Sequence, residues 1–129
     1  MKPQRIPEIK KMLCSCQECK ETNGYFAKLR DLGDDLNKNE DFNRLIMFAS
    51  ALSSKDRLII LRTLKGRDKC VCELEVVLNK SQSTISHHIG KLLAASLIEG
   101  YKKGNFTYYH LLEDNLKSQI EILNRELQV

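Results

Sequence analysis

CVCELEVVLNKSQSTISHHIGKLLAA, residues 70–95, contains two short amphipathic segments on either side of a turn. In the turn, Asn79 tolerates the left-handed backbone conformation that a tight reversal needs, and Ser81 can cap the helix that follows. The apolar residues that we expect to face inward recur at helical spacing, and they are Leu74, Val77, Leu78, Ile85, Ile89, Leu92 and Leu93. Two short helices joined by a three-residue turn form a helix-turn-helix.

Further elements are predicted on both sides of this motif. A first helix begins near the potential N-cap Asn39, and its apolar residues are Phe42, Leu45, Ile46, Ala49 and Leu52. A second helix begins after Ser53, ends at Gly66 and carries the apolar stripe Leu58, Leu61 and Leu64. After the motif, YKKGNFTYY at residues 101–109 places β-forming residues around a Gly-Asn turn, which predicts a hairpin. A last helix is predicted from the stripe Leu112, Leu116, Ile120, Leu123 and Leu127.

This order of elements predicts a mainly α fold with a small β-hairpin, a winged helix-turn-helix. We expect residues 39–129 to form this domain. Residues 1–38 contain both prolines and three of the five cysteines, and we expect them to form a partly helical N-terminal arm.

Composition and charge narrow the class of protein. The chain has 129 residues, of which 42% are hydrophobic, enough to build a core without disulfide support. Its formal net charge is +4, and residues 80–110 contain four lysines and all three histidines but one acidic residue. The N-terminus has no apolar run typical of a signal peptide, and no stretch is long enough to span a bilayer, so we expect a cytoplasmic protein. Five cysteines in a reducing compartment favour metal binding or redox chemistry over a disulfide framework.

The second helix of the motif presents polar residues suited to reading DNA. Glutamine and serine bond base edges, threonine offers a methyl group to thymine, and histidine or lysine reaches bases or phosphates. Lysines near the hairpin tip can contact the phosphate backbone. The candidate DNA-binding residues are Gln82, Ser83, Thr84, Ser86, His87, Lys91, Lys102 and Lys103. The alternative is an ordinary solvated helix face, but the preceding turn and the lysine-bearing hairpin favour DNA binding.

The candidate metal ligands form two clusters, Cys70 with Cys72 and, on the arm, Cys14, Cys16 and Cys19. Side chains two residues apart in mid-helix point about 200° apart and cannot bind one ion together, whereas at the first turn they can. The unpaired amides of a helix N-terminus also stabilise thiolates. The alternative for Cys72 is a small core residue, which leaves Cys70 as the stronger candidate. Thiols from both clusters together could supply three or four sulfur ligands.

Two runs resemble a known family. LNKSQSTISHHI, residues 78–89, resembles the recognition helix of the ArsR/SmtB family, and KCVCEL, residues 69–74, resembles its metal-binding Cys-Val-Cys box. The similarity extends from about residue 42 to about residue 127 and includes ALS at 51–53 and YY at 108–109. The resemblance implies a homodimer paired through its first and last helices, which binds operator DNA without metal and releases it when an inducer ion binds. It also implies base or groove contacts from Gln82, Ser83, Ser86 and His87.

The arm cysteines make the chain similar to the cadmium- and lead-sensing CadC-type branch of that family, in which arm cysteines join the box cysteines, usually across the dimer. That branch separates its arm pair by three residues, whereas one, two or four intervene here, so which two arm cysteines are used stays open. Glu75 stands where some arsenite sensors have a third cysteine. The family's zinc site on the last helix corresponds to Glu113, Asn115, Glu126 and Val129, a set without imidazoles, so we expect this helix to be mainly a dimer surface.

These observations predict a metal- or metalloid-responsive transcriptional repressor whose inducer is cadmium, lead, zinc or arsenite. The alternative on the same fold is a thiol redox-responsive regulator, in which a disulfide within the arm, or between arm and box, takes the place of the metal. An enzyme is disfavoured because the sequence contains no Ser-His-Asp arrangement or phosphate-binding loop. The expected partners are double-stranded operator DNA and a second copy of the chain, with no membrane and no organic small-molecule substrate.

Overall fold

The computed structural model describes residues 2–13 and 22–128, and the chain divides into two compact units, Met1–Glu40 and Asp41–Val129. The first unit contains α1 (Arg5–Leu13) and α2 (Thr22–Asn37), so the described part of the arm is largely helical. Phe26 of α2 is buried, and two cations lie over its ring, with Lys10 Nζ 5.1 Å and the Arg30 guanidinium 5.5 Å from the ring centroid. These cation–π contacts contribute to the packing within the unit.

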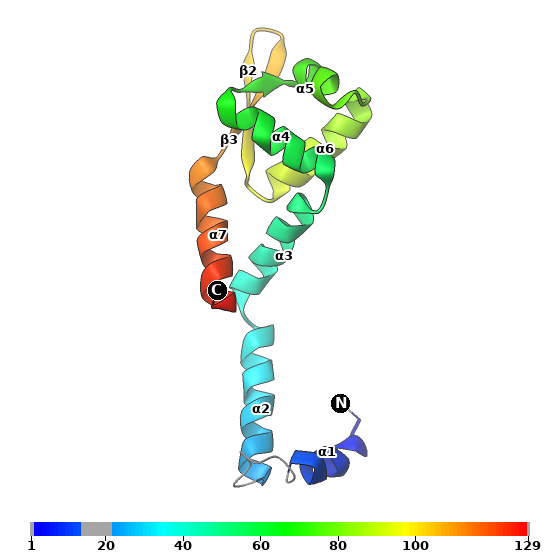
Figure 1. Ribbon diagram of the computed structural model, residues 1–129, viewed down its shortest axis with the longest axis vertical. Helices are drawn as coiled ribbons and strands as arrows, with labels where there is room; N and C mark the ends of the chain where they lie inside the picture. Colours follow the sequence, from blue (N-terminus) through cyan, green and yellow to red (C-terminus); the bar gives the residue numbers. More distant parts are fainter. Residues whose placement is uncertain (1, 14–21, 129) are drawn as a thin grey trace. The chain divides into compact units, whose positions relative to one another are not determined.

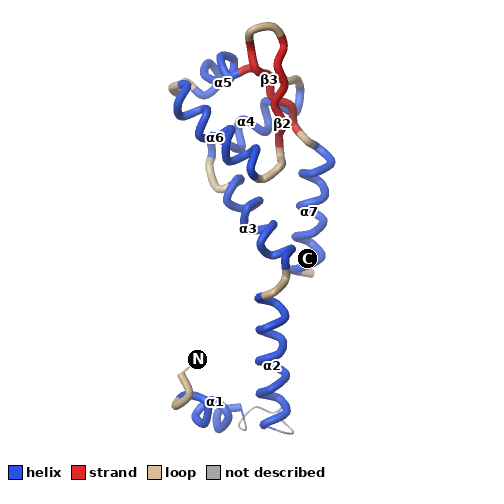
Figure 2. The backbone as a smooth tube through the Cα atoms, turned by 180° about the vertical axis from the view of Figure 1, so that it is seen from behind, coloured by secondary structure: helices blue, strands red, loops and turns tan. Residues whose placement is uncertain are grey.

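The second unit combines helices with a small antiparallel sheet (Figure 1). Its elements in chain order are α3 (Glu40–Leu52), α4 (Lys55–Gly66), β1 (Lys69–Cys70), α5 (Val71–Leu78), α6 (Gln82–Ala94), β2 (Ile98–Lys103), β3 (Phe106–Leu111) and α7 (Glu113–Leu127). Strand β3 lies between β1 and β2. The β2–β3 hairpin is the predicted wing, and Figure 2 shows it projecting past α5. The unit is a winged helix-turn-helix, as the sequence predicts.

Helix α4 begins one residue later than expected. Ser54, not Ser53, is its N-cap, because the Ser54 hydroxyl accepts a hydrogen bond from the backbone N–H of Arg57 at 3.4 Å. The Ser53 hydroxyl instead donates to the Ser50 carbonyl at 2.7 Å and so belongs to the end of α3. The helix ends at Gly66, as predicted.

The hydrophobic core of the second unit is formed by side chains from α3, α4, α5, α6, β2 and β3. Its largest fully buried side chains are Ile60, Leu74, Ile85, Leu92 and Leu97. Three members of the predicted apolar stripes of α4, α5 and α6 are exposed, and they are Leu58 at 48%, Val77 at 47% and Leu93 at 41%. On these helices the buried side chains cover a narrower part of the circumference than the apolar stripe does, and at about 100° per residue the three exposed side chains fall at its edge. On α3 the predicted stripe is wrong, because Ile46 is 65% exposed and the buried residues are Phe48 and Ala51.

A buried arginine links the end of α3 to α6. Arg57 is 8% exposed and donates from Nε to the Ala51 carbonyl at 2.8 Å and from Nη2 to the Ser50 carbonyl at 3.0 Å. Its Nη1 lies 3.0 Å from Nδ1 of His88 on α6. Because a guanidinium can only donate, this Nδ1 accepts, which places the imidazole proton on Nε2, 3.4 Å from Asp56 Oδ2. Arg57, which lies on α4, therefore connects the end of α3 to α6.

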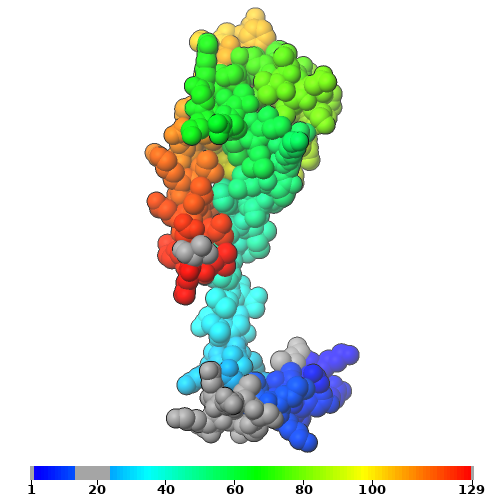
Figure 3. All heavy atoms as spheres, viewed as in Figure 1, coloured from blue at the N-terminus to red at the C-terminus, as the bar shows by residue number. Residues whose placement is uncertain are grey.

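The last helix is only partly covered in the single chain. No residue of α7, all of which the structure describes, is buried. Arg125 Nη2 lies 2.7 Å from Asp41 Oδ2, and Figure 3 shows α7 and α3 side by side. The most exposed apolar residues of the two helices are Ile46, Met47, Ile120 and Leu127. Neither α7 nor any other helix in the described ranges is long and apolar enough to cross a membrane.

Candidate DNA-binding face and cysteine pocket

The helix-turn-helix is built by contacts between residues close in sequence. After α5 ends at Leu78, Asn79 adopts the left-handed conformation, with φ 53° and ψ 46°. Ser81 then caps α6, and its hydroxyl accepts from the backbone N–H of Thr84 at 3.3 Å. The same hydroxyl lies 3.1 Å from the Ser83 hydroxyl and 3.0 Å from that of Thr84. Ser83 and Thr84 therefore contribute to the N-cap of α6, and each hydroxyl retains further hydrogen-bonding capacity for contact with DNA.

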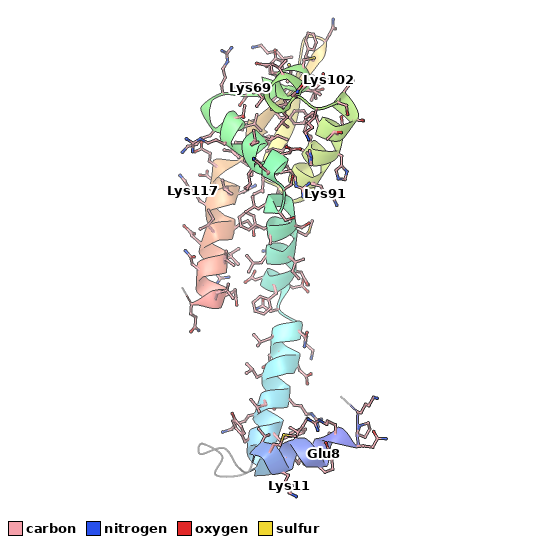
Figure 4. The ribbon with its side chains drawn as sticks, turned by 45° about the vertical axis from the view of Figure 1, so that its right-hand side comes forward. Glu8, Lys11, Lys69, Lys91, Lys102 and Lys117 are labelled. Carbon is pink, nitrogen blue, oxygen red and sulfur yellow. The ribbon has the colours of Figure 1, made fainter. Side chains whose placement is uncertain are left out.

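The other candidates on α6 form one exposed face. Gln82 and Ser86 are four residues apart, and so are His87 and Lys91, so each pair lies along one side of the helix. All four are exposed, as the sequence predicts, and Figure 4 shows Lys91 on α6. Amide, hydroxyl and imidazole groups in this arrangement can reach base edges, and the ammonium can reach phosphates. The adjacent His88 does not belong to the face, because it bonds inward to the buried guanidinium.

The wing carries two exposed lysines beside a tight turn. Lys102 and Lys103 end β2, and Gly104 reverses the chain with a φ of +64° (Figure 4 shows Lys102). Lys103 Nζ lies 5.7 Å from the centroid of the Tyr108 ring on β3. Tyr108 stacks on Tyr101, with the ring centroids 6.0 Å apart. An aromatic pair thus supports a lysine near the tip of the hairpin, where the ammonium can contact a phosphate.

A carboxylate anchors the base of the wing. Tyr101 donates its hydroxyl to Asp68 Oδ2 at 2.6 Å, and Nδ1 of His110 lies 2.8 Å from Asp68 Oδ1. The hydrogen bond from Tyr101, followed by that from His110, lowers the pKa of Asp68. The hydrogen bond to Asp68 in return raises the pKa of His110 and the pKa of Tyr101. The partners are 33 and 42 residues apart in sequence, so no local pattern reveals this cluster.

Cys70 and Cys72 line one pocket of about 350 Å³ beside the wing. Cys70 of β1 pairs with Tyr108 of β3 in the sheet. Cys70 is also the N-cap of α5, so both thiols lie at the start of this helix, as predicted. The backbone N–H of Cys70 donates to Glu73 Oε1 at 3.1 Å, and this bond lowers the pKa of Glu73. The other residues that line the pocket are Arg67, Asp68, Glu73, Phe106 and Tyr108.

Burial distinguishes the two cysteines. Cys70 is 8% exposed, whereas Cys72 is exposed. The interpretation of Cys72 as a small core residue is therefore wrong, and the buried thiol is the one that the sheet holds in place. The arm candidates Cys14, Cys16 and Cys19 lie outside the described residues. Within the described ranges, no group of three or more histidine, cysteine, aspartate or glutamate residues is arranged to hold a metal ion.

The positions that correspond to a last-helix zinc site make other contacts. Asn115 donates from Nδ2 to the Ser96 carbonyl at 3.0 Å and so ties α7 to the turn after α6. Glu126 Oε1 lies 3.7 Å from Arg125 Nη2. Val129 lies outside the described residues. Asn115 therefore helps to hold α7 against the turn that follows α6.

The chain is similar in sequence and in fold to known transcription regulators. A sequence model described as "Bacterial regulatory protein, arsR family" matches residues 54–99, from the N-cap of α4 into β2. The arsenical resistance operon repressor of Bacillus subtilis is 34% identical over 94 residues, covering 72% of this chain and 87% of that protein. The cadmium resistance transcriptional regulatory protein CadC of Listeria innocua is 32% identical over 78 residues, covering 60% of each. The solved structure of an ArsR-like transcriptional regulator from Rhodococcus matches with a TM-score of 0.63 at 29% identity, covering 67% of this chain and 82% of that one.

Proposed function

This chain belongs to the arsR family of bacterial regulatory proteins, which are DNA-binding transcription regulators and not enzymes, and we propose that it represses transcription until a thiophilic ion binds. The observation that carries the proposal is the position of Cys70 and Cys72 in one pocket beside the wing. An ion bound there lies next to an element that contacts DNA. The relatives named for arsenical and cadmium resistance support a metal or metalloid as the signal.

In the proposed complex, α6 lies in the major groove and the wing follows the phosphate backbone. The proposed contacts to base edges or the groove are Gln82, Ser83, Thr84, Ser86 and His87, and the proposed phosphate contacts are Lys91, Lys102 and Lys103. We propose that the protein binds as a homodimer, because the exposed apolar side chains of α3 and α7 form a surface that a second copy can cover. With one α6 from each chain, the dimer binds an inverted repeat whose half-sites are about 34 Å apart.

The proposed inducer site combines Cys70 and Cys72 with two of the arm cysteines Cys14, Cys16 and Cys19, as in CadC-type regulators. The exposed Cys72 gives an ion access from solvent, and the buried Cys70 gives it a ligand held by the sheet. A sulfur-rich donor set of this kind suits cadmium, lead or zinc, and three thiolates suit arsenite.

Ion binding leads to release of DNA through two effects, a change in the net charge of the protein and a tether between the arm and α5. If four thiols bind one divalent ion, four protons leave and the net charge changes by −4 + 2 = −2 per site. Negative charge added to a protein that depends on attraction to phosphates opposes DNA binding. A tether between the arm and α5 also changes the angle between the two recognition helices of the dimer.

Fluorescence anisotropy with operator DNA tests this proposal under strictly reducing conditions. Cadmium, lead, zinc and arsenite are added to the wild type and to single Cys→Ser variants, with magnesium as the hard-ion control. We expect release in the wild type with a coupling free energy of about 1 to 3 kcal/mol. Cys70→Ser should abolish release and leave operator binding by the metal-free protein nearly intact. Cys72→Ser, Cys16→Ser and Cys19→Ser should be intermediate to severe, and Cys14→Ser mildest.

Two results decide between this proposal and the redox alternative. Cadmium and lead thiolates absorb in the near ultraviolet, whereas a disulfide switch needs no metal. If every cysteine variant still released DNA on addition of metal, thiolate sensing would be excluded. If the wild type released DNA only on oxidation and not on addition of metal, the cysteines would form a thiol redox switch on the same fold.

A further inference from the structure

We propose that Tyr108 of β3 is a positioning residue that couples the cysteine pocket to the DNA-contacting end of the wing. The inference rests on the proposed function, because it takes an ion at Cys70 and Cys72 as its trigger. It adds a route from the ion to the DNA that runs through the sheet to Lys103 and does not depend on a change in α6.

The first step is that Cys70 belongs to the same sheet as the wing. Strand β1 consists of Lys69 and Cys70, which pair with Tyr109 and Tyr108 of β3. Because antiparallel pairing fixes the two backbones through hydrogen bonds, a displacement of Cys70 passes directly to β3. Cys70 is also the N-cap of α5, so a ligand that moves it acts on the start of the helix and on the sheet together.

The second step is that the Tyr108 ring borders both the pocket and a DNA-binding lysine. Tyr108 and Phe106 line the cysteine pocket. Lys103 Nζ lies 5.7 Å from the centroid of the Tyr108 ring. Tyr101 pairs with Tyr108, and Lys103 pairs with Phe106, so these four side chains share one face of the hairpin. The pocket and the lysine therefore have an aromatic wall in common.

The third step is that the segment leading into the cysteine box holds both strands of the wing. Asp68 accepts a hydrogen bond from Tyr101 of β2 at 2.6 Å and contacts His110 of β3 at 2.8 Å. Asp68 is two residues before Cys70, and it also lines the pocket. The wing and the cysteine segment are thus joined at three places: through the carboxylate, through the strand pairing and through the shared wall of the pocket.

These interactions give the coupling a measurable signature. The pocket that contains Cys70 and Cys72 is bordered by Tyr108 and Phe106, so we expect an ion bound to these cysteines to displace the Tyr108 ring from Lys103. If the lysine on each wing of a dimer then leaves its phosphate, the salt slope of operator binding falls by about 2. A route that runs only from α5 to α6 leaves the contribution of the wing to this slope unchanged.

The test compares the wild type with Tyr108→Leu, which removes the ring, and with the matched control Tyr108→Phe, which keeps it. Cadmium is titrated into each protein while near-ultraviolet absorbance reports thiolate binding. Anisotropy with operator DNA at several salt concentrations reports release. We expect thiolate absorbance in all three proteins. In the wild type and in Tyr108→Phe, cadmium should weaken binding and lower the salt slope by about 2. In Tyr108→Leu the weakening, relative to its own metal-free affinity, should be smaller by about fivefold or more, with no change of slope.

The outcomes separate the inference from the proposed function. If Tyr108→Leu binds cadmium and releases operator as completely as the wild type, the inference is overturned and the proposed function stands. If the wild type shows no thiolate absorbance or no release, the proposed function fails and the inference falls with it. Lys103→Ala serves if Tyr108→Leu does not fold, because Lys103 is exposed. This variant should bind metal-free operator more weakly and show no cadmium-dependent change of slope, and a slope change that persists would overturn the inference.

Discussion

Arg57→Met tests the buried link between α3 and α6, because methionine keeps much of the apolar stem of arginine and removes its donors. The change deprives three acceptors of the guanidinium, and they are the carbonyls of Ser50 and Ala51 and Nδ1 of His88. The Ser50 carbonyl still accepts from the hydroxyl and the backbone N–H of Ser53 in the variant, so only the bonds to Ala51 and His88 are counted as lost. A hydrogen bond to a charged group contributes about 1.5 to 3 kcal/mol, and at the lower figure the expected loss in free energy of unfolding is about 3 kcal/mol.

Urea unfolding at one fixed protein concentration measures this loss, since the stability of a dimer depends on concentration. With a slope of about 2 kcal/mol per molar urea, the midpoint should fall by about 1.5 M. Arg62→Met is the matched control, because Arg62 is exposed on the same helix, and we expect a change of about 0.5 kcal/mol or less. A loss below about 1 kcal/mol for Arg57→Met, or equal losses in the two variants, would refute the stabilising role of the buried donors.

Two further predictions concern DNA binding and pH. Ser86→Ala and His87→Ala should each weaken operator binding by about 1 to 3 kcal/mol with little effect on random DNA, whereas Lys102→Ala should weaken both alike and lower the salt slope by about 1 per wing. Equal losses on both DNAs in all three variants would contradict a base-contact role for α6. The raised pKa of His110 means that its interaction with Asp68 stabilises the fold fully below the ordinary value of 6.5, and this stabilisation disappears as pH rises through the raised pKa. Thermal unfolding between about pH 6 and pH 8 should therefore show a steeper decline for the wild type than for His110→Asn, and parallel curves would exclude this contribution.

Elements that depend on near neighbours could be predicted from the sequence. The left-handed Asn79 and the cap by Ser81 involve residues within a few positions of one another, so residue identity was enough to predict the end of α5 and the start of α6. The turn at Gly104 predicts the wing for the same reason. The helical period likewise predicts that Ser86 and His87 share the exposed face of α6.

Contacts between distant residues could not be predicted in this way. Arg57 and His88 are 31 residues apart, and Asp68 is 33 and 42 residues from Tyr101 and His110. Nothing in local spacing specifies such pairs, because they depend on how whole elements pack. Packing also decides which residues of an apolar stripe are buried, and Leu58 shows that membership of the stripe is not enough.

For the cysteine box, some features follow from the local sequence and others only from the tertiary structure. The amino-acid pattern alone places Cys70 and Cys72 at the start of the first helix of the helix-turn-helix, since caps and periodicity are local properties. The folded chain decides that Cys70 is the buried thiol and that it joins the sheet of the wing through Tyr108. Cys70 and Tyr108 are 38 residues apart and pair only because the packing of the intervening helices brings the two strands together, and no short-range signal encodes that packing.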